Sequence, residues 1–253
     1  MILALCGTIE GGQLLQLLAE KQMDVMATVT TDYGAKCLGE NPQAKILEGK
    51  LTAPELEQLL RTGEIEAIID VTHPYATVIS TMAIEVSSTH GVPYYRYERK
   101  KTTFDDSVQV YGVESFPEAA ALCNSIPGNI FLAIGSNHLP TFTAQLEVKR
   151  LIARVLPFGH IVKGCEDQGF TPDNLIAMKG PFDEAMNQWM FQRYQAAAVV
   201  TKDSGAAGGT IEKINAAKKM GIPVILVRRP GINYGKTFDS LQELVAAVTA
   251  DQG

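Results

Sequence analysis

Short apolar runs alternate with helical patterns along the whole chain, and this alternation restricts the fold more than any other feature of the sequence. The first run, Ile2–Leu5, is followed by a glycine-rich turn and a helical segment that carries Leu14 and Leu18 on its apolar side. Strands that alternate with helices pair in parallel through crossover connections, so the pattern predicts an α/β fold with mainly parallel sheets flanked by helices. The other runs expected to form strands are Val25–Val29, Ile46–Leu47, Ile65–Val71, Pro93–Tyr97, Val108–Val113, Ile130–Ile134, Leu151–Val155, Leu175–Met178, Ala197–Thr201 and Val224–Val227.

Capping signals fix the start of several expected helices. Thr52 and Glu55 have the spacing of a capping box, which predicts a helix from there to about Arg61. The same spacing recurs at Ser115 and Glu118 and again at Ser240 and Glu243, where a last helix should run towards Ala250. Further helices are expected at Tyr75–His90, Asp183–Tyr194 and Thr210–Met220.

Two segments of the chain resemble each other and indicate an internal repeat. In residues 90–99 and in residues 220–229, the end of a helix is followed by Gly, an apolar residue, Pro, an apolar strand and then arginines. We interpret them as equivalent positions in two Rossmann-like domains, residues 1–101 and residues 102–253, with a ligand cleft between them. The polar stretch from Lys100 to Ser107 is the expected join.

Composition narrows the function classes. The chain has 253 residues, and its 22 Lys+Arg against 28 Asp+Glu give a net charge of −6, which disfavours general nucleic-acid binding. Four cysteines, at positions 6, 37, 123 and 165, form no Cys-x-x-Cys pair, so neither a metal site nor a disulfide framework is expected. The first apolar run is too short for a signal peptide or membrane span, which favours a cytoplasmic protein without a membrane partner.

The turn after the first strand is a candidate phosphate site. Gly7 lets the backbone approach an anion, Thr8 offers a hydroxyl, and the N-terminus of the following helix leaves backbone N–H groups unpaired. The fit to Gly-x-Gly-x-x-Gly is imperfect, because Cys6 takes one glycine position and Glu10 brings a negative charge; a purely structural turn is the alternative.

The end of the second strand leaves the cofactor type open. Asp32 there favours the free ribose hydroxyls of NADH, whereas Thr30 and Thr31 suit the ribose phosphate of NADPH. The sequence does not decide between these two cofactors.

A histidine follows the strand expected at Ile65–Val71. Pro74 is expected to open the next helix, which would place Thr72 or His73 near its N-cap, facing the ligand crevice. A contact between His73 and a ligand is the favoured interpretation, and a role as proton donor stays open.

The most unusual stretch of the chain is Val199–Thr210, which again joins a strand to a helix. Its glycines indicate a tight turn that cradles an anion. Lys202 precedes the glycines, so the stretch is not a Walker A loop, and Ser204 lacks the spacing of a Gly-x-Ser-x-Gly elbow. Lys202 at a strand end is suited to a carboxylate. Two basic clusters at strand ends point to an anionic ligand: Arg96, Arg99, Lys100 and Lys101 in the first half, and Lys213, Arg228 and Arg229 in the second.

These stretches together resemble the precorrin-6A reductase family and its cobalt-precorrin-6A counterpart. The matches, in chain order, are Gly7-Thr8-x-Glu10, Asp70-x-Thr72-His73-Pro74-Tyr75, Pro93-x-x-Arg96-x-Glu98-Arg99, Gly135-Ser136, Lys179-Gly180-Pro181-Phe182, the loop Thr201–Gly209 with Glu212-Lys213, and Arg228-Arg229-Pro230. The loop is specific, and the first turn alone is not. Cys6 departs from the family, which usually has glycine at that position.

The resemblance implies a reductase of cobalamin biosynthesis that uses NADPH or NADH to reduce one ring double bond of an anionic tetrapyrrole. It implies dinucleotide contacts from Gly7, Thr8, Ile9, Glu10, Thr30 and Thr31, and nicotinamide-side contacts from Thr72, His73, Pro74 and Tyr75. The macrocycle is expected to contact Lys202, Asp203, Ser204, Gly205, Gly208 and Gly209, with Lys213, Arg96 and Arg228 adding charge.

Lys202, Asp203 and His73 are the candidate catalytic residues, among which the sequence does not choose a proton donor. No metal ligand is expected, and monomer and homodimer both remain open. The rival interpretations are a non-catalytic dinucleotide sensor and a phosphate-binding transferase.

Overall fold

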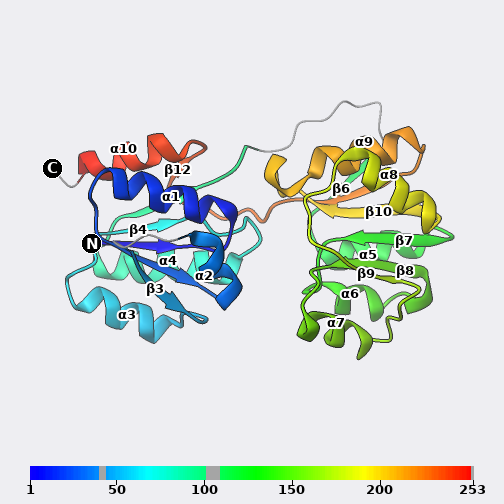
Figure 1. Cartoon of the computed structure of the whole chain (residues 1–253), viewed down its shortest axis with the longest axis horizontal. Helices are drawn as coiled ribbons and strands as arrows, with labels where there is room; N and C mark the ends of the chain where they lie inside the picture. The colour runs from blue at the N-terminus through cyan, green and yellow to red at the C-terminus, as the bar shows by residue number, and fades with distance from the viewer. Residues whose placement is uncertain (40–43, 101–108, 252–253) are drawn as a thin grey trace. The chain divides into compact units, whose positions relative to one another are not determined.

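The chain folds into two α/β units, each built on a six-stranded sheet (Figure 1). The structure, a computed structural model, describes residues 1–39, 44–100 and 109–251. All ten strand pairings assigned in the two sheets are parallel. The predicted fold class, two Rossmann-like α/β domains, is confirmed, and the ligand cleft expected between them stays a prediction.

Unit 1 consists of Met1–Arg99 and Pro230–Gly253, and its sheet has the order β12-β5-β4-β1-β2-β3. With β12 as the sixth strand, this is the 3-2-1-4-5-6 order of dinucleotide-binding sheets. Its strands are β1 (Ile2–Leu5), β2 (Val25–Val29), β3 (Ala44–Glu48), β4 (Ala67–Asp70), β5 (Tyr94–Tyr97) and β12 (Lys236–Phe238). Its helices are α1 (Ile9–Glu20), α2 (Asp32–Leu38), α3 (Ala53–Arg61), α4 (Thr77–His90) and α10 (Leu241–Asp251).

The strands of unit 1 are apolar on both faces because helices cover both. Leu14 and Leu18 of α1 pack with Leu244 and Val248 of α10 on one face. On the other face, α3 and α4 contribute a second cluster that includes Leu56 (Figure 1). Parallel sheets buried in this way need near-continuous apolar strands, and β1 and β4 are wholly buried.

Unit 2 consists of Lys100–Arg229, and its sheet has the order β6-β11-β10-β7-β8-β9. Its strands are β6 (Val110–Val113), β7 (Asn129–Ala133), β8 (Leu151–Val155), β9 (Leu175–Ala177), β10 (Ala196–Lys202) and β11 (Val224–Val227). Its helices are α5 (Phe116–Asn124), α6 (Leu139–Thr143), α7 (Gly159–Glu166), α8 (Glu184–Arg193) and α9 (Thr210–Lys219), with short 3-10 turns η1 (Val148–Arg150) and η2 (Ala206–Gly208). A cluster that includes Phe191 of α8 and Ile214 of α9 forms the core on one face of this sheet.

The predicted internal repeat agrees with the two strand orders. β5 lies beside β4, which lies beside β1; β11 lies beside β10, which lies beside β7. The two segments that resemble each other in sequence therefore end in strands at equivalent positions of their sheets. An αL glycine, Gly91, ends the helix before β5, and Gly221 has a similar positive φ before β11.

The expected boundary is corrected at the C-terminal end. Residues from Pro230 onward belong to unit 1, not to a second domain of residues 102–253. β12 pairs with β5, and α10 buries Leu244 and Val248 against α1. The expected boundary between 101 and 102, with Lys101 and most of the expected join, lies outside the described residues.

Local capping predicted element starts well. The Thr52–Glu55 capping box and the Ser115 N-cap are both present. Four elements were not predicted: the helices α2, α6 and α7 and the strand β12. They are short or lack a regular apolar period, so tertiary contacts rather than local pattern define them.

The described parts of the chain contain no membrane-spanning helix, no metal-binding cluster and no disulfide. No helix there combines the length and hydropathy needed to cross a membrane. No group of three His, Cys, Asp or Glu side chains there is arranged to hold a metal ion. The four cysteines are free thiols, and only Cys37 is exposed.

Candidate functional site

The predicted ligand residues gather at the carboxyl ends of the strands in each unit. In unit 1, strand order reverses between β1 and β4, and in unit 2 between β7 and β10. Ligands of doubly wound sheets bind in the crevice outside the strands at such points. Each unit therefore has its own candidate crevice at its reversal point.

The turn after β1 presents a row of free backbone donors. Among the described residues, the N–H groups of Gly7, Thr8 and Ile9 have no hydrogen-bond acceptor. Thr8 is the N-cap of α1, and its hydroxyl donates to the Val71 carbonyl at 3.0 Å, which ties the turn to the end of β4. A Cβ added to Gly7 would meet nothing within 4 Å. The turn is thus shaped for an anion at a helix N-terminus.

Cys6 replaces the first glycine of the fingerprint without disturbing the turn. Its side chain is buried in the core of unit 1, and burial, followed by the charge of Asp70, raises the pKa of its thiol to about 12. The thiol packs against Gly11, where an added Cβ would lie 3.2 Å from the Cys6 Sγ and 2.8 Å from Leu38. Gly11 thus keeps the close helix–strand packing that the third glycine of such motifs allows.

The Glu10 charge is neutralised within unit 1. Arg99 donates to both carboxylate oxygens, from Nε at 2.6 Å and from Nη2 at 2.7 Å. Burial raises the pKa of Glu10, but hydrogen bonds from Arg99 and Thr8 and the Arg99 charge outweigh it, and the net pKa is lowered. The Glu10 side chain is occupied, so of this predicted cofactor residue only the backbone remains a candidate.

The threonines after β2 divide into one free and one structural side chain. Thr31 is the N-cap of α2 and accepts a hydrogen bond from the Gly34 N–H at 3.1 Å. Thr30 is exposed. The side chain of Asp32 lies outside the described residues. Beside the ends of β2 and β3, a pocket of about 450 Å³ is lined in part by Thr28, Gly49 and Lys50.

Asp70, at the end of β4, is a buried hub that was not predicted. Its carboxylate accepts from the Thr72 N–H at 2.8 Å and the Thr72 hydroxyl at 2.6 Å, and from Ser80 and Tyr94 at 2.6 Å each. Arg96 adds an ion pair at 2.7 Å. Burial, followed by the Asp70 charge, raises the pKa of Tyr94 above its ordinary value.

Two predictions change because of this hub. Arg96 is fully buried and paired with Asp70 and Glu98, so its predicted substrate contact is wrong for the side chain as placed. The Thr72 hydroxyl is also occupied, since it donates to Asp70 and accepts from Arg96 at 3.1 Å. Both side chains support the crevice and do not line it.

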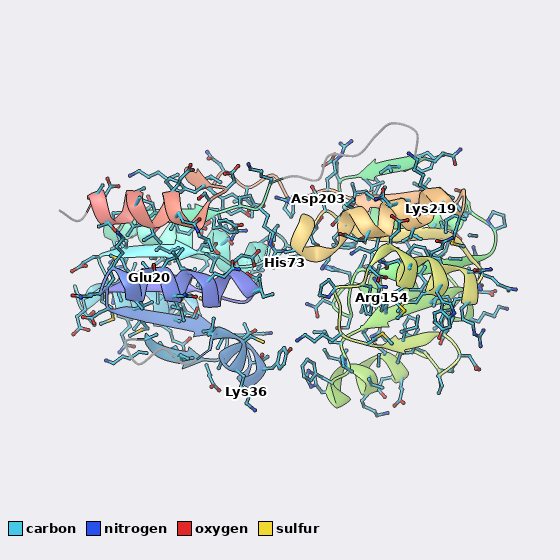
Figure 2. All side chains as sticks on the ribbon, turned by 45° about the horizontal axis from the view of Figure 1, so that its top comes forward. Glu20, Lys36, His73, Arg154, Asp203 and Lys219 are labelled. Carbon is cyan, nitrogen blue, oxygen red and sulfur yellow. The ribbon has the colours of Figure 1, made fainter. Side chains whose placement is uncertain are left out.

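His73 lies in a turn and not at a helix N-cap (labelled in Figure 2). The His73 carbonyl accepts from the Ala76 N–H at 2.7 Å, which closes a turn over Pro74, and α4 begins only at Thr77, with Ala76 as N-cap. The predicted helix start at Pro74 is therefore wrong: the His73 carbonyl, which a helix would pair with the N–H of residue 77, accepts from Ala76 in a tighter turn. The His73 Nδ1 accepts from the Tyr75 N–H at 3.2 Å, so in this geometry any proton on the neutral ring is on Nε2.

The glycine-rich loop of unit 2 is a compact turn closed on itself. Thr210 accepts from the Ser204 N–H at 3.2 Å and donates to the Lys202 carbonyl at 3.2 Å. A Cβ on Gly208 would lie 2.2 Å from the Ser204 Cβ, and Gly209 has φ +63° as the N-cap of α9. The tight turn is confirmed: the N–H groups of Ser204, Gly205 and Gly208 are hydrogen-bonded within the loop. The anion cradle expected here stays a prediction.

Lys202 is the last residue of β10, and Asp203 follows it. The two side chains have different surroundings. Burial lowers the pKa of Lys202 to about 8. Asp203 is 8% exposed and lies 3.5 Å from Arg229, whose Nε donates to the Asp203 carbonyl at 2.9 Å. The pair mirrors Asp70 with Arg96 at the equivalent strand end of unit 1.

The substrate contact expected from Arg228 stays a prediction, and its neighbour Arg229 has different surroundings. Arg228 is 60% exposed and pairs with Glu114 beside the edge strand β6, whereas Arg229 turns in towards Asp203. Lys213, also predicted, is buried, and its ammonium donates to the Gly208 carbonyl at 2.8 Å.

A histidine that was not predicted lies near Lys202. His138 caps α6 after β7, and its ring stacks on Phe116 with 3.6 Å between centroids. Burial and then the Lys202 charge lower its pKa. A neutral imidazole near a lysine at the reversal point of the sheet is a further candidate for proton transfer.

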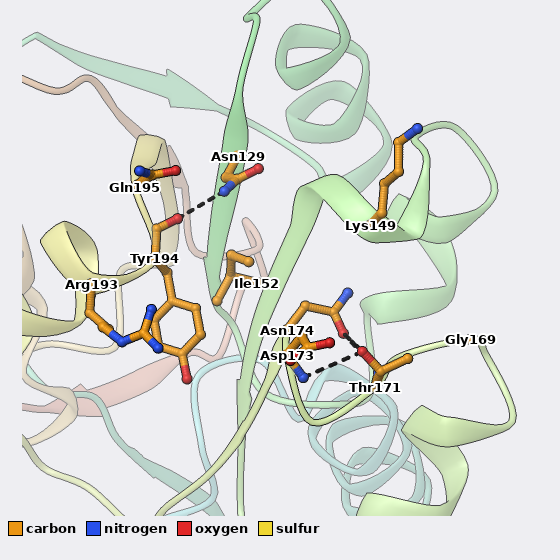
Figure 3. A pocket seen from close by; sticks show the side chains of 10 residues that line it. All are labelled: Asn129, Lys149, Ile152, Gly169, Thr171, Asp173, Asn174, Arg193, Tyr194 and Gln195. Carbon is orange, nitrogen blue, oxygen red and sulfur yellow. Dashed lines mark hydrogen bonds between the residues drawn. The ribbon is translucent and has the colours of Figure 1, made fainter.

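A pocket of about 460 Å³ in unit 2 lies at the amino ends of the strands of its sheet (Figure 3). It is lined by Asn129 and Ile152, at the starts of β7 and β8, and by Tyr194 and Gln195 before β10. Because ligands of parallel sheets bind at the carboxyl ends, this pocket is not part of the candidate site.

Comparison with known proteins decides the family. The family model described as precorrin-6x reductase CbiJ/CobK matches residues 1–249. The chain belongs to the precorrin-6x reductase family. Among its relatives, a cobalt-precorrin-6A reductase of Priestia megaterium is 34% identical over 252 residues, covering 98% of each chain. A precorrin-6A reductase of Rhodobacter capsulatus is 29% identical over 237 residues, covering 91% of this chain and 88% of that one.

A solved structure supports the same membership. The structure described as CobK precorrin-6A reductase superposes with a TM-score of 0.79 at 26% identity, covering 100% of this chain and 96% of that one. Precorrin-6x reductases are oxidoreductases of cobalamin biosynthesis, so the rival interpretations of a non-catalytic sensor and a phosphate-binding transferase are not supported. Within this reductase, Gly7, Thr8 and Ile9 belong to unit 1, and Lys202 and Asp203 to unit 2.

Proposed function

We propose that this reductase binds NADH or NADPH in unit 1 and reduces one ring double bond of precorrin-6A or cobalt-precorrin-6A. The observation that carries the cofactor half is the row of three unpaired backbone N–H groups at Gly7, Thr8 and Ile9. They lie at the N-terminus of α1, beside the reversal point of a 3-2-1-4-5-6 sheet. A dinucleotide pyrophosphate suits such donors.

The adenosine part of the cofactor belongs near the end of β2. The pocket lined in part by Thr28, Gly49 and Lys50 offers room there. Thr30, exposed beside it in sequence, suits either a ribose hydroxyl or a ribose phosphate. His73 and Tyr75, after β4, are assigned to the nicotinamide side.

The substrate half of the proposal rests on the family and on the charge of unit 2. Relatives that cover nearly the whole chain are named for precorrin-6A or its cobalt form. Lys202, Lys213 and Arg229 bring positive charge to the carboxyl ends of β10 and β11, where an anionic tetrapyrrole would need it.

When bound, a reduced nicotinamide supplies the hydride, and the ring also takes up one proton. The residues of this chain hold the pyrophosphate at Gly7–Ile9, orient the nicotinamide through His73, and place cations beside the macrocycle. Lys202, with a pKa lowered to about 8 by burial, can hold a proton near neutral pH. Burial and then the Lys202 charge lower the pKa of His138 and favour its neutral ring, which can accept a proton.

The substitution Gly7→Ala tests the cofactor site without testing the fold. Its Cβ meets nothing within 4 Å in the free protein, so the free energy of unfolding should change by less than about 0.5 kcal/mol. A methyl group at the closest approach to the pyrophosphate should weaken NAD(P)H binding at least roughly tenfold, by displacing a charge-assisted contact. The binding is measured by titrating the cofactor fluorescence with NADH and with NADPH.

The matched control is Gly164→Ala in α7, where an added Cβ also meets nothing within 4 Å. It should change neither cofactor binding nor turnover. The oxidation of NAD(P)H is then followed by its absorbance, once with metal-free and once with cobalt-containing precorrin-6A as the substrate. Unchanged cofactor affinity in Gly7→Ala would remove the turn from the site, and no turnover with either substrate would refute the reaction.

A further inference from the structure

A row of three residues crosses the sheet of unit 2 near its carboxyl edge. Thr201 of β10 pairs with Ala133 of β7, and Leu132 of β7 pairs with Ala153 of β8, one residue before Ala133 and Arg154 in their strands. Paired residues of parallel strands point to the same face of a sheet. Two residues earlier, Val199, Phe131 and Ile152 form part of the core under α8 and α9, so the row faces these two helices.

The row has a small apolar residue, Ala133, in its middle and a polar side chain at each end. Ala133, in a central strand, is partly buried and packs against the core under α8 and α9. At one end, Thr201 is fully buried, and its hydroxyl has no hydrogen-bond partner among the described residues. A buried hydroxyl without a partner costs free energy, so it calls for a ligand or a specific role.

At the other end of the row lies Arg154, whose guanidinium group is fixed by neighbouring side chains. Arg154 donates from Nη1 to the Asn187 Oδ1 at 2.9 Å, and its guanidinium lies 4.3 Å from the centre of the Phe182 ring (Arg154 is labelled in Figure 2). These contacts fix its plane. Arg154 is partly buried, and this burial lowers its pKa to about 10.

Helix α9 brings a second cation to the same place. Lys213 is 6% exposed and spends one ammonium proton on the Gly208 carbonyl at 2.8 Å, which leaves two protons for other acceptors. Burial first, and then the charges of Arg154 and Lys202, lower its pKa to about 7. The Glu212 charge raises the pKa of Lys213, but one carboxylate does not balance the charges of Arg154, Lys202 and Lys213.

We propose that Arg154, Lys213 and Thr201 form a binding site for a carboxylate on the α8–α9 side of the unit 2 sheet. A carboxylate supplies the acceptor that the Thr201 hydroxyl lacks, and it takes further hydrogen bonds from the guanidinium of Arg154 and the ammonium of Lys213, whose charges it compensates. The identity of the carboxylate rests on the proposed function, since an acidic side chain of the tetrapyrrole is its natural source. A single water could satisfy Thr201, but it would leave the charge uncompensated.

The decisive variant is Thr201→Val, which keeps the shape of the side chain and removes the hydroxyl. Since the hydroxyl has no partner, the free protein should be as stable as the wild type or more stable. The KM for the tetrapyrrole should rise roughly tenfold, as expected for a lost hydrogen bond to a charged group, while the Kd for NAD(P)H stays unchanged. Arg154→Gln should raise the same KM at least as much.

Arg193→Gln is the matched control, because Arg193 is an exposed cation at the end of α8. It should leave the KM for the tetrapyrrole within twofold of the wild type. An unchanged KM in Thr201→Val with a folded protein overturns the site. So does a loss of stability in Thr201→Val without a change in KM, because the hydroxyl would then be structural.

A second measurement does not depend on turnover. The Tm of each variant is recorded in sodium succinate, sodium phosphate and sodium chloride at equal ionic strength. Succinate should raise the Tm of the wild type and of Arg193→Gln by about 2 °C over chloride. It should not raise the Tm of Thr201→Val or of Arg154→Gln. No effect of succinate on the wild type, or an effect of phosphate alone, contradicts a carboxylate site. If succinate acts as expected but neither precorrin substrate is reduced, the proposed function fails and the site stands.

Discussion

Burial of a lysine in α9 makes the stability of unit 2 depend on pH. Lys213 keeps one hydrogen bond, but burial and two neighbouring cations lower its pKa to about 7 from an ordinary value of 10.5. Between these two values the unfolded chain binds more protons than the folded chain, so the free energy of unfolding rises with pH. Below pH 7 both states are protonated, and the penalty for burying the charge is fully present.

The substitution Lys213→Met should remove this dependence. We expect the advantage of Met over Lys in the free energy of unfolding to shrink by roughly 3 kcal/mol from pH 7 to pH 9.5, since a pKa unit corresponds to 1.36 kcal/mol. Urea unfolding at several pH values measures it. Lys219→Met, an exposed position of the same helix, should give a difference that is flat with pH. Parallel curves for Lys213→Met and the wild type would show that the lysine stays charged in the folded state.

At the scale of single residues, the sequence predicted the kinds of side chain but not which of two neighbours is used. Arg96 and Arg228 were chosen for the substrate, whereas Arg96 is buried with Asp70 and Arg228 lies at an exposed edge. Arg229 takes the inner position instead. Adjacent arginines after a strand look equivalent in a sequence, and only the path of the chain decides which turns inward.

At the scale of elements, one carboxylate joins two strands and a helix of unit 1. Asp70 at the end of β4 binds Arg96 and Tyr94 of β5 and Ser80 of α4. Through the Thr72 N–H it also shapes the segment that carries His73. The crevice at the reversal point thus depends on a buried polar network as well as on apolar packing.

Asp70→Asn should therefore be far more harmful than its size suggests. The amide keeps the shape but leaves the Arg96 charge buried with Glu98 as its one remaining acid, and breaking a buried pair costs about 3–5 kcal/mol. Urea unfolding measures the loss. Asp173→Asn, at an exposed position of unit 2, should change stability by less than about 0.5 kcal/mol. A loss below about 1 kcal/mol in Asp70→Asn would mean that the network is not a structural requirement.

Elements with their own capping residues were predictable, and elements defined by distant partners were not. Thr52 with Glu55 and Ser115 with Glu118 mark helix starts that the structure confirms. The predicted start of α4 was wrong, because the His73 carbonyl bonds the Ala76 N–H in a turn over Pro74 instead of opening a helix. β12 carries no strand signal of its own, and its pairing with β5 is what makes it a strand.

At the scale of the whole molecule, unit 1 is closed by the end of the chain. β12 takes the sixth position of its sheet, and the sixth position of the unit 2 sheet is taken by β6, the first strand of that unit. The presence of two Rossmann-like halves was predicted from the internal repeat in residues 90–99 and 220–229. The return of residues 230–251 to the first half did not, because a local pattern does not encode which sheet a strand joins.

A core substitution in the last helix should accordingly weaken the first unit. Leu244 of α10 is fully buried in the cluster that holds Leu14 and Leu18 of α1, so Leu244→Ala should destabilise unit 1 by about 2–5 kcal/mol. Hydrogen exchange followed by peptide should then show lost protection in β1, β4 and α1 and unchanged protection in β7 and β10. Leu132→Ala, equally buried in β7, should give the reverse distribution. Loss of protection in unit 2 on Leu244→Ala would mean that the two units unfold as one, since α10 has no place in the core of unit 2.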